Sequence, residues 1–108
     1  MDQDYILKFK ELVDADFKRH KNVSYYAVKL DISRYTLSQK TLNVEGKSPK
    51  KIIDDIVMDK AKRLLLRSDD SIKEIALALG FNDPTNFHTF FRKHEGVTPS
   101  GFREKIRT

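Results

Sequence analysis

Hydrogen-bonding side chains gather on one face of two short helical segments. The first face carries Tyr35, Ser38 and Gln39, and the second carries Thr85, His88 and Thr89. A glutamine amide can pair with adenine through two hydrogen bonds, hydroxyls can bond to base edges, and a tyrosine ring or threonine methyl can touch a thymine methyl. We therefore predict that these faces read double-stranded DNA, Gln39 and His88 foremost. The first face extends to Leu42 and the second to Arg92 if these side chains also point outward, and a core or dimer contact is the alternative for Leu42.

Basic side chains flank both faces and suit phosphate binding. They are Arg34, Lys40, Arg92 and Lys93, followed by Lys50 and Lys51 at the start of a later helix. Contacts to phosphate hold a protein on the duplex without reading its sequence. Backbone N–H groups at helix starts can bind phosphate as well. An ordinary solvated helix surface is the alternative for every polar residue named so far.

The second face needs two helices to position it, and the first of these follows Ser71. Its apolar residues recur at i, i+3, i+4 and i+7, as Ile72, Ile75, Ala76 and Leu79. This spacing makes one apolar helix face. Ser71 and Glu74 can form a capping box at its start, and Gly80 can adopt positive φ and end it in a tight turn.

The second of these helices starts after Asp83 and carries the polar face. Asp83 suits an N-cap, and Pro84 suits the first helical position because it has no N–H to leave unpaired. Phe87 and Phe91 lie four residues apart and predict a buried side. Two short helices joined by a tight turn, with a polar outer face on the second, form the helix-turn-helix pattern.

The same unit occurs twice in the chain. An offset of 49 residues relates four apolar positions of the second copy to Val23, Tyr26, Ala27 and Leu30. An offset of 50 relates Ser33 and Leu37 to Asp83 and Phe87, and G-K-S-P at 46–49 to G-V-T-P at 96–99. An internal repeat is more specific than either copy alone, so it predicts two helix-turn-helix units.

Further helices complete an expected all-α fold. Residues 4–19 predict a first helix, whose apolar face is Tyr5, Phe9, Leu12, Val13 and Phe17. A long helix can run from Pro49 to about Arg67, which is about 27 Å, and one short helix can follow Pro99 with Phe102 facing the body. Asn22 suits an N-cap, and residues 68–70 break the long helix. We expect a first subdomain over about 4–48, a linker helix over about 49–67 and a second subdomain over about 71–106.

Composition supports a globular domain with a basic surface. The chain has 108 residues and a net charge of +5, of which residues 1–16 contribute −3 and the remainder +8. A basic body suits a polyanionic partner, and a solvated basic surface is the alternative. The chain contains no cysteine, no apolar run long enough to cross a membrane and no secretory leader pattern. We expect no membrane contact, and an intracellular location fits this composition.

Several motifs carry a family resemblance. They are A-K-R-L-L at 61–65, S-I-K-E-I-A at 71–76, L-G-F at 79–81, N-F at 86–87 and F-R-K-H-E-G-V-T-P-S-G-F-R at 91–103. V-S-Y-Y-A-V-K-L-D-I-S at 23–33, with L-S-Q and G-K-S-P after it, is similar to the first unit of the same family. On these motifs the chain resembles the DNA-binding domain of the AraC/XylS transcriptional regulators over nearly its full length.

The resemblance implies seven helices, with two helix-turn-helix subdomains joined by a long linker helix. It implies promoter binding and contact with bacterial RNA polymerase, usually for activation, and hence a cytoplasmic location at the bacterial nucleoid. Base contacts from the third and sixth helices would fall on Tyr35, Ser38, Gln39, Pro84, Thr85, His88 and Thr89. The family often has Arg near Thr89 and a large apolar residue near Thr41, so the chain departs from the pattern there. An effector, dimerisation or receiver domain usually precedes this domain, so we expect a fragment of a longer regulator, with a stand-alone short regulator as the alternative.

Other functions have weaker support. His20, His88 and His94 show no metalloprotease or triad spacing, and adjacent carboxylates such as Asp54 and Asp55 diverge by about 100° on a helix. We therefore expect no enzyme, cofactor, metal or small-molecule ligand, and a monomeric isolated domain. A helical protein–protein interaction module with a basic surface is the main alternative. A helix-turn-helix fragment of a recombinase is a further one, although no catalytic residue set is visible.

Overall fold

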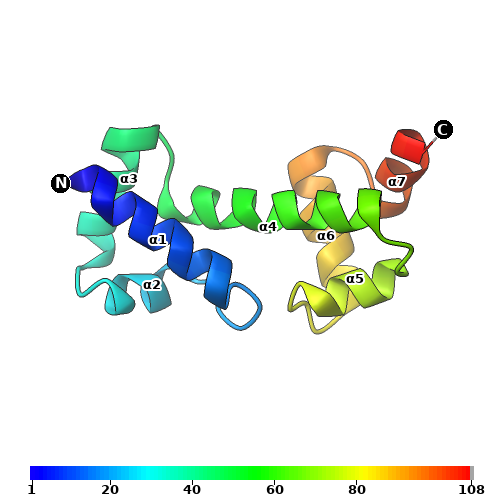
Figure 1. Cartoon of the computed structure of the whole chain (residues 1–108), viewed down its shortest axis with the longest axis horizontal. Coiled ribbons are helices and arrows are strands. Elements are labelled where there is room, and N and C mark those ends of the chain that lie inside the picture. The colour runs from blue at the N-terminus through cyan, green and yellow to red at the C-terminus, as the bar shows by residue number, and fades with distance from the viewer. Residues whose placement is uncertain (108) are drawn as a thin grey trace. The chain divides into compact units, whose positions relative to one another are not determined.

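The computed structural model describes residues 1–107 and contains seven α-helices and no strand in that range (Figure 1). The helices are α1 (Asp2–Asp16), α2 (Val23–Lys29), α3 (Arg34–Glu45), α4 (Pro49–Arg67), α5 (Ile72–Ala78), α6 (Pro84–Glu95) and α7 (Pro99–Arg107). The chain divides into two compact units, one over Met1–Ile56 and one from Val57 onward, and α4 contributes to both. The expected all-α fold is confirmed.

Local hydrogen bonds start four of the helices at the predicted caps. The side chains of Asn22 and Ser33 each accept a hydrogen bond from the backbone N–H three residues later, at 2.9 and 3.0 Å respectively. Ser71 Oγ accepts from Glu74 N at 3.0 Å while Glu74 Oε1 accepts from Ser71 N at 2.9 Å, which completes the capping box. Asp83 Oδ1 accepts from the N–H of Thr85 at 2.8 Å. Each bond satisfies a backbone donor that the helix itself leaves unpaired.

The first unit packs α1 and α2 against α3. The rings of Phe9 and Tyr26 meet edge to face with centroids 5.8 Å apart, and both side chains are fully buried. The prediction of α1 over 4–19 was wrong at its end, because the helix stops at Asp16. The hydroxyl of Tyr25 donates to Asp16 Oδ2 at 2.6 Å, and that of Tyr26 donates to the carbonyl of His20 at 2.5 Å. These bonds hold the segment after α1 as a turn.

The inward face of α1 also differs from the expected one. Ile6, Phe9 and Val13 are buried, whereas Tyr5, Leu12 and Phe17 of the expected face are only partly buried. Ile6, Phe9 and Val13 are spaced i, i+3 and i+7, so the buried stripe of α1 starts at Ile6, one residue after the expected Tyr5.

The tight turns of the two units use different residues. Gly80 follows α5 with φ of +87°, as predicted from its freedom to adopt positive φ. The corresponding position in the first unit is Asp31, which adopts φ of +57°. Aspartate tolerates this left-handed conformation better than most residues. The repeat therefore keeps its backbone geometry where the glycine is missing.

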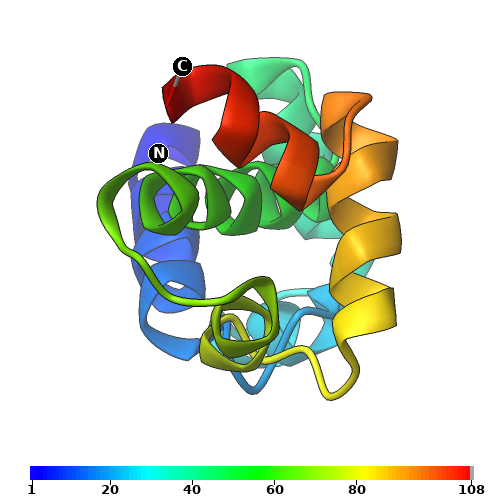
Figure 2. The same ribbon diagram turned by 90° about the vertical axis from the view of Figure 1, so that its right-hand side faces the viewer.

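The second unit has an aromatic core between α5, α6 and α7. Phe87 and Phe91 are fully buried, with ring centroids 5.9 Å apart. Phe81, in the turn, lies 5.4 Å from Phe87, and Phe102 of α7 lies 5.5 Å from Phe91. Figure 2 shows α5 and α7 at opposite ends of α6 in this unit. The core therefore anchors one side of α6 along its length and leaves the other side outward.

Candidate nucleic-acid interface

The outward face of α3 is set by the two buried residues on its opposite side. Leu37 and Thr41 have no exposed surface, which turns positions 35, 38 and 39 away from the first unit's core. Tyr35 is 73% exposed, Gln39 is exposed and Ser38 is partly exposed. The predicted base-reading residues of the first unit therefore share one accessible face.

Thr41 occupies the position where the family resemblance implies a large apolar side chain. Its hydroxyl is buried, and it donates to the carbonyl of Ser38 at 3.2 Å, one turn earlier in α3. This bond satisfies the buried donor, so the threonine is accommodated without an unpaired polar group. The departure in sequence does not interrupt α3, which carries the predicted base-reading residues Tyr35, Ser38 and Gln39.

The outward face of α6 is built in the same way. The burial of Phe87 and Phe91 leaves Thr85, His88 and Thr89 exposed on the other side of the helix. Pro84 is partly buried at the first helical position. The structure thus brings Thr85, His88 and Thr89 onto one accessible face and places Pro84 at its edge.

The predicted phosphate-binding residues fall into two groups, and the first is unpaired. Arg34, Arg92 and Lys93 are exposed, and none of them forms an ion pair within residues 1–107. Arg92 and Lys93 lie in the last turn of α6, where cations are favoured by the helix dipole. Their charges are available to a polyanion.

The second group of lysines is already paired with carboxylates. Lys40 lies 2.9 Å from Asp2 and 4.4 Å from the ring centroid of Tyr5, and it is only 19% exposed. The ammonium groups of Lys50 and Lys51 lie 3.0 and 2.8 Å from carboxylates four residues later in α4. A phosphate would have to replace a carboxylate at each of these three lysines.

Two carboxyl pKa values record this pairing. The hydrogen bond from Lys40 lowers the pKa of Asp2 below its ordinary value. Burial alone would raise the pKa of Asp55, but hydrogen bonds from Lys51 and Lys47 lower it below the ordinary value. Both carboxylates therefore stay charged at neutral pH and hold their lysines.

The helix starts differ in what they offer to a phosphate. The carboxylate of Asp83 already occupies the N-terminus of α6, which disfavours a second negative charge. The hydroxyls of Ser33 and Ser48 are neutral caps at α3 and α4. Backbone phosphate binding thus fits the starts of α3 and α4 better than that of α6.

The sequence left the location of Leu42 open between the outward face of its helix, the core and a dimer contact. The structure excludes the core. The side chain is 49% exposed, so Leu42 is not a core residue of the first unit. Its exposure was not decidable from periodicity alone, because a leucine on an outward face violates the expected pattern.

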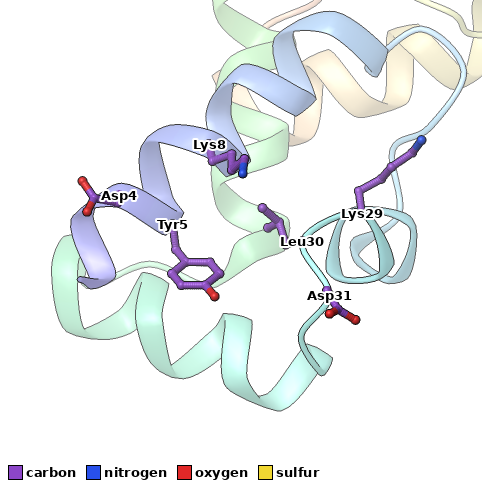
Figure 3. Close-up of a pocket in the computed structure, with 6 residues that line it drawn as sticks. All are labelled: Asp4, Tyr5, Lys8, Lys29, Leu30 and Asp31. Atoms are coloured by element: carbon purple, nitrogen blue, oxygen red, sulfur yellow. The ribbon is translucent and has the colours of Figure 1, made fainter.

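A hollow in the first unit is lined by residues of α1 and of the end of α2. Figure 3 shows Asp4, Tyr5 and Lys8 of α1 opposite residues 29–31 at the end of α2. The hollow is open and carries two carboxylates and two ammonium groups of opposite charge.

Within residues 1–107 no group of three or more His, Asp or Glu side chains is placed to hold a metal ion. None of the helices in this range has the length and apolar composition that a membrane span requires.

Comparison with known proteins identifies the family. A family model described as a helix-turn-helix domain matches residues 26–105. A crystal structure of a transcriptional regulator with an AraC-type DNA-binding domain from Chromobacterium violaceum superposes with a TM-score of 0.83, at 25% identity, over 96% of this chain and 93% of that one. The chain belongs to the AraC-type helix-turn-helix family. This AraC-type domain contains both repeats, since the match begins in α2 and ends in α7.

Curated relatives of this AraC-type domain are longer proteins. The transcriptional activator RhaS of Escherichia fergusonii is 36% identical over 76 residues, which are 66% of this chain and 27% of RhaS. The Msm operon regulatory protein of Streptococcus mutans is 30% identical over 106 residues, which are 95% of this chain and 37% of that protein. The chain therefore spans well under half the length of these relatives.

Proposed function

We propose that this chain binds double-stranded DNA at a specific site and regulates bacterial transcription as part of a longer effector-responsive regulator. The observation that carries the proposal is the pair of capped helices, α3 and α6, each with two buried residues on one side and exposed hydrogen-bonding groups on the other. A helix of this kind is the element that enters the major groove in helix-turn-helix proteins. The names of the relatives as transcriptional regulators support the same function.

The proposed base contacts come from the two outward faces. Tyr35, Ser38 and Gln39 act from α3, and Pro84, Thr85, His88 and Thr89 act from α6. Arg34, Arg92 and Lys93 bind phosphates directly, whereas Lys40, Lys50 and Lys51 do so by exchanging a carboxylate partner. Two successive major-groove segments on one side of a duplex are about 34 Å apart, so the proposed site has two motifs about 10 bp apart.

The remaining parts of the proposal concern the whole regulator. The chain acts in the bacterial cytoplasm, contacts RNA polymerase at the promoter, and is monomeric when separated from the rest of its regulator. It performs no catalysis. The proposed subdomains are residues of about 4–48 and about 71–106, joined by the linker helix of about 49–67.

Selection of bound duplexes from a random library, followed by a salt titration on the best duplex, tests the proposal. We expect a two-part site whose affinity falls steeply with salt, because neutralised phosphates release counterions. One motif instead of two would limit base reading to a single unit. Indifference to every duplex would refute DNA binding and favour a protein–protein interaction module.

Two substitutions test the principal readers against a matched control. Gln39→Ala and His88→Ala should each reduce discrimination between the selected site and random DNA, by about 1–3 kcal/mol where the lost contact is bidentate. Gln3→Ala removes the chain's other glutamine side chain, which is exposed on α1, and should leave discrimination unchanged. Unchanged discrimination in Gln39→Ala or His88→Ala would remove that residue from the reading face.

A further inference from the structure

Leu42 lies at the centre of the reading face of α3. Successive residues of an α-helix turn by about 100°, which places Leu42 within about 60° of Tyr35, Ser38 and Gln39 around the helix axis. Leu37, which is buried, lies about 140° away on the opposite side. Leu42 is 49% exposed, so a leucine side chain faces solvent among the predicted base readers.

The internal repeat makes this leucine informative. Positions 35, 38, 39 and 42 of α3 correspond at an offset of 50 to positions 85, 88, 89 and 92 of α6. Both sets have the spacing i, i+3, i+4 and i+7, with which homeodomain recognition helices read the major groove. The fourth position holds exposed Arg92 in the second unit and Leu42 in the first. The first unit therefore has an apolar group where the second has a cation.

None of positions 35, 38, 39 and 42 of α3 carries a charge, and two of them carry apolar contact groups. Tyr35 and Leu42 are 73% and 49% exposed, and they lie on either side of Gln39 along the helix. The exposed Arg34 lies about 40° from Ser38 around the axis, at the first position of α3, whereas Lys40 is about 140° from Tyr35 and is held by Asp2. In the major groove the apolar feature of a base pair is the C5-methyl group of thymine, and the glutamine amide matches adenine.

We infer that Leu42 is a fourth base-reading residue, and that α3 recognises a half-site rich in A·T pairs by placing Leu42 and Tyr35 against thymine methyl groups around a Gln39–adenine contact. The inference rests on the proposed function, since it names the kind of sequence that the first unit reads. Arg92, at the corresponding position of the second unit, keeps the different task proposed above, which is binding phosphate. The two units then differ in chemistry although they share a fold.

Thymine-to-uracil exchange in the selected duplex tests the methyl contacts directly. Deoxyuridine keeps the hydrogen-bonding edge of thymidine and lacks only its C5-methyl group. We expect single exchanges in the first half-site to weaken binding about fourfold at each contacted thymine, the factor for exposing one buried methyl group. In the Leu42→Ala variant, the exchange should have no further effect at the thymine that Leu42 touches.

Salt dependence separates an apolar contact from an ionic one. Leu42→Ala should weaken binding about five- to tenfold and leave the slope of log affinity against log salt unchanged. Arg92→Ala should reduce that slope by about one if the arginine binds a phosphate. Leu7→Ala removes another leucine of the first unit, 61% exposed on α1, and serves as the matched control. Circular dichroism should show unchanged helix content in both leucine variants, because alanine is a strong helix former.

The outcomes distinguish failure of the inference from failure of the proposed function. A site-specific duplex that tolerates uracil throughout, or Leu42→Ala binding equal to that of Leu7→Ala, would overturn the role of Leu42 while leaving DNA reading intact. A dimer in sedimentation that Leu42→Ala dissociates would overturn it in favour of a contact between two copies. Absence of any site-specific duplex would refute the proposed function itself.

Discussion

Arg103 ties α7 to the end of α4, and its removal should destabilise the second unit. Its Nε donates to the carbonyl of Leu65 at 3.1 Å, its Nη1 to that of Asp70 at 2.6 Å and its Nη2 to that of Ser68 at 3.2 Å. A weaker contact joins Nη2 to the carbonyl of Leu64 at 3.5 Å. These carbonyls belong to the last turn of α4 and the segment after it, where a helix runs out of its own backbone donors. The carbonyl of Leu64 also accepts from Ser68 N at 3.0 Å, and that of Ser68 also accepts from Arg107.

The magnitude follows from the number and kind of these bonds. A hydrogen bond to a charged group contributes about 1.5–3 kcal/mol, and a cation at a helix C-terminus adds about 0.3–1 kcal/mol. Arg103 is partly exposed, so water can replace some of the lost donors. We expect Arg103→Ala to lower the free energy of unfolding of the second unit by about 2–3 kcal/mol. Arg103→Lys keeps the charge but loses the planar fork of donors, so this variant should lower the free energy of unfolding by about 1–2 kcal/mol.

Urea unfolding followed by circular dichroism measures the loss, and amide hydrogen exchange locates it. Arg103→Ala should reduce protection in α7 and at the end of α4 before it affects α1–α3. Arg63→Ala is the matched control, because Arg63 is 65% exposed and its one ion pair among residues 1–107 is with Asp59, four residues earlier in α4, at 3.0 Å. It should change stability by less than about 0.5 kcal/mol. Stability of Arg103→Ala equal to that of Arg63→Ala would refute the reasoning, and Arg103→Lys equal to wild type would show that charge alone suffices.

Two further predictions concern the cores. Phe87→Ala should lower the stability of the second unit by about 3–5 kcal/mol, because a fully buried ring would leave a cavity, and a melting curve that does not move would show that the ring is not anchoring α6. Burial raises the pKa of Tyr26 to about 12, so the unfolded chain loses this proton near pH 10 while the folded chain keeps it. The stability advantage of wild type over Tyr26→Phe should thus be constant below about pH 10 and shrink between about pH 10 and 12, and a difference that stays constant to pH 12 would contradict the shifted pKa.

Local interactions were predictable from the sequence. Asn22, Ser33, Ser71 and Asp83 begin the helices that the sequence assigned to them, because each cap bonds to a backbone group two or three residues away. The outward faces of α3 and α6 were predictable from the sequence for a related reason, because helical periodicity places them opposite buried residues such as Leu37 and Phe87.

Contacts between distant residues were decided only by the tertiary structure. The sequence predicted that Lys40 is available to phosphate. In the structure Asp2 of α1, 38 residues away in the sequence, lies 2.9 Å from its ammonium group. Arg103 belonged to a recognised motif, but its carbonyl partners lie 33–39 residues earlier and leave no trace in spacing. The end of α1 and the turn after it likewise accept hydrogen bonds from tyrosine hydroxyls of α2, at Asp16 and His20, which spacing along the sequence does not reveal.

Leu42 shows where the two kinds of information meet. The sequence placed Leu42 by periodicity at an outward position and left the outward face, the core and a dimer contact as alternatives. Packing of α1 and α2 on the other side of α3 leaves 49% of that side chain exposed, which removes the core alternative. The sequence by itself determined the helices, their caps and their repeated order, because these arise from bonds a few residues apart. Only the tertiary structure decided which charges are paired and which apolar groups stay exposed, because burial and ion pairing depend on segments far apart in the chain.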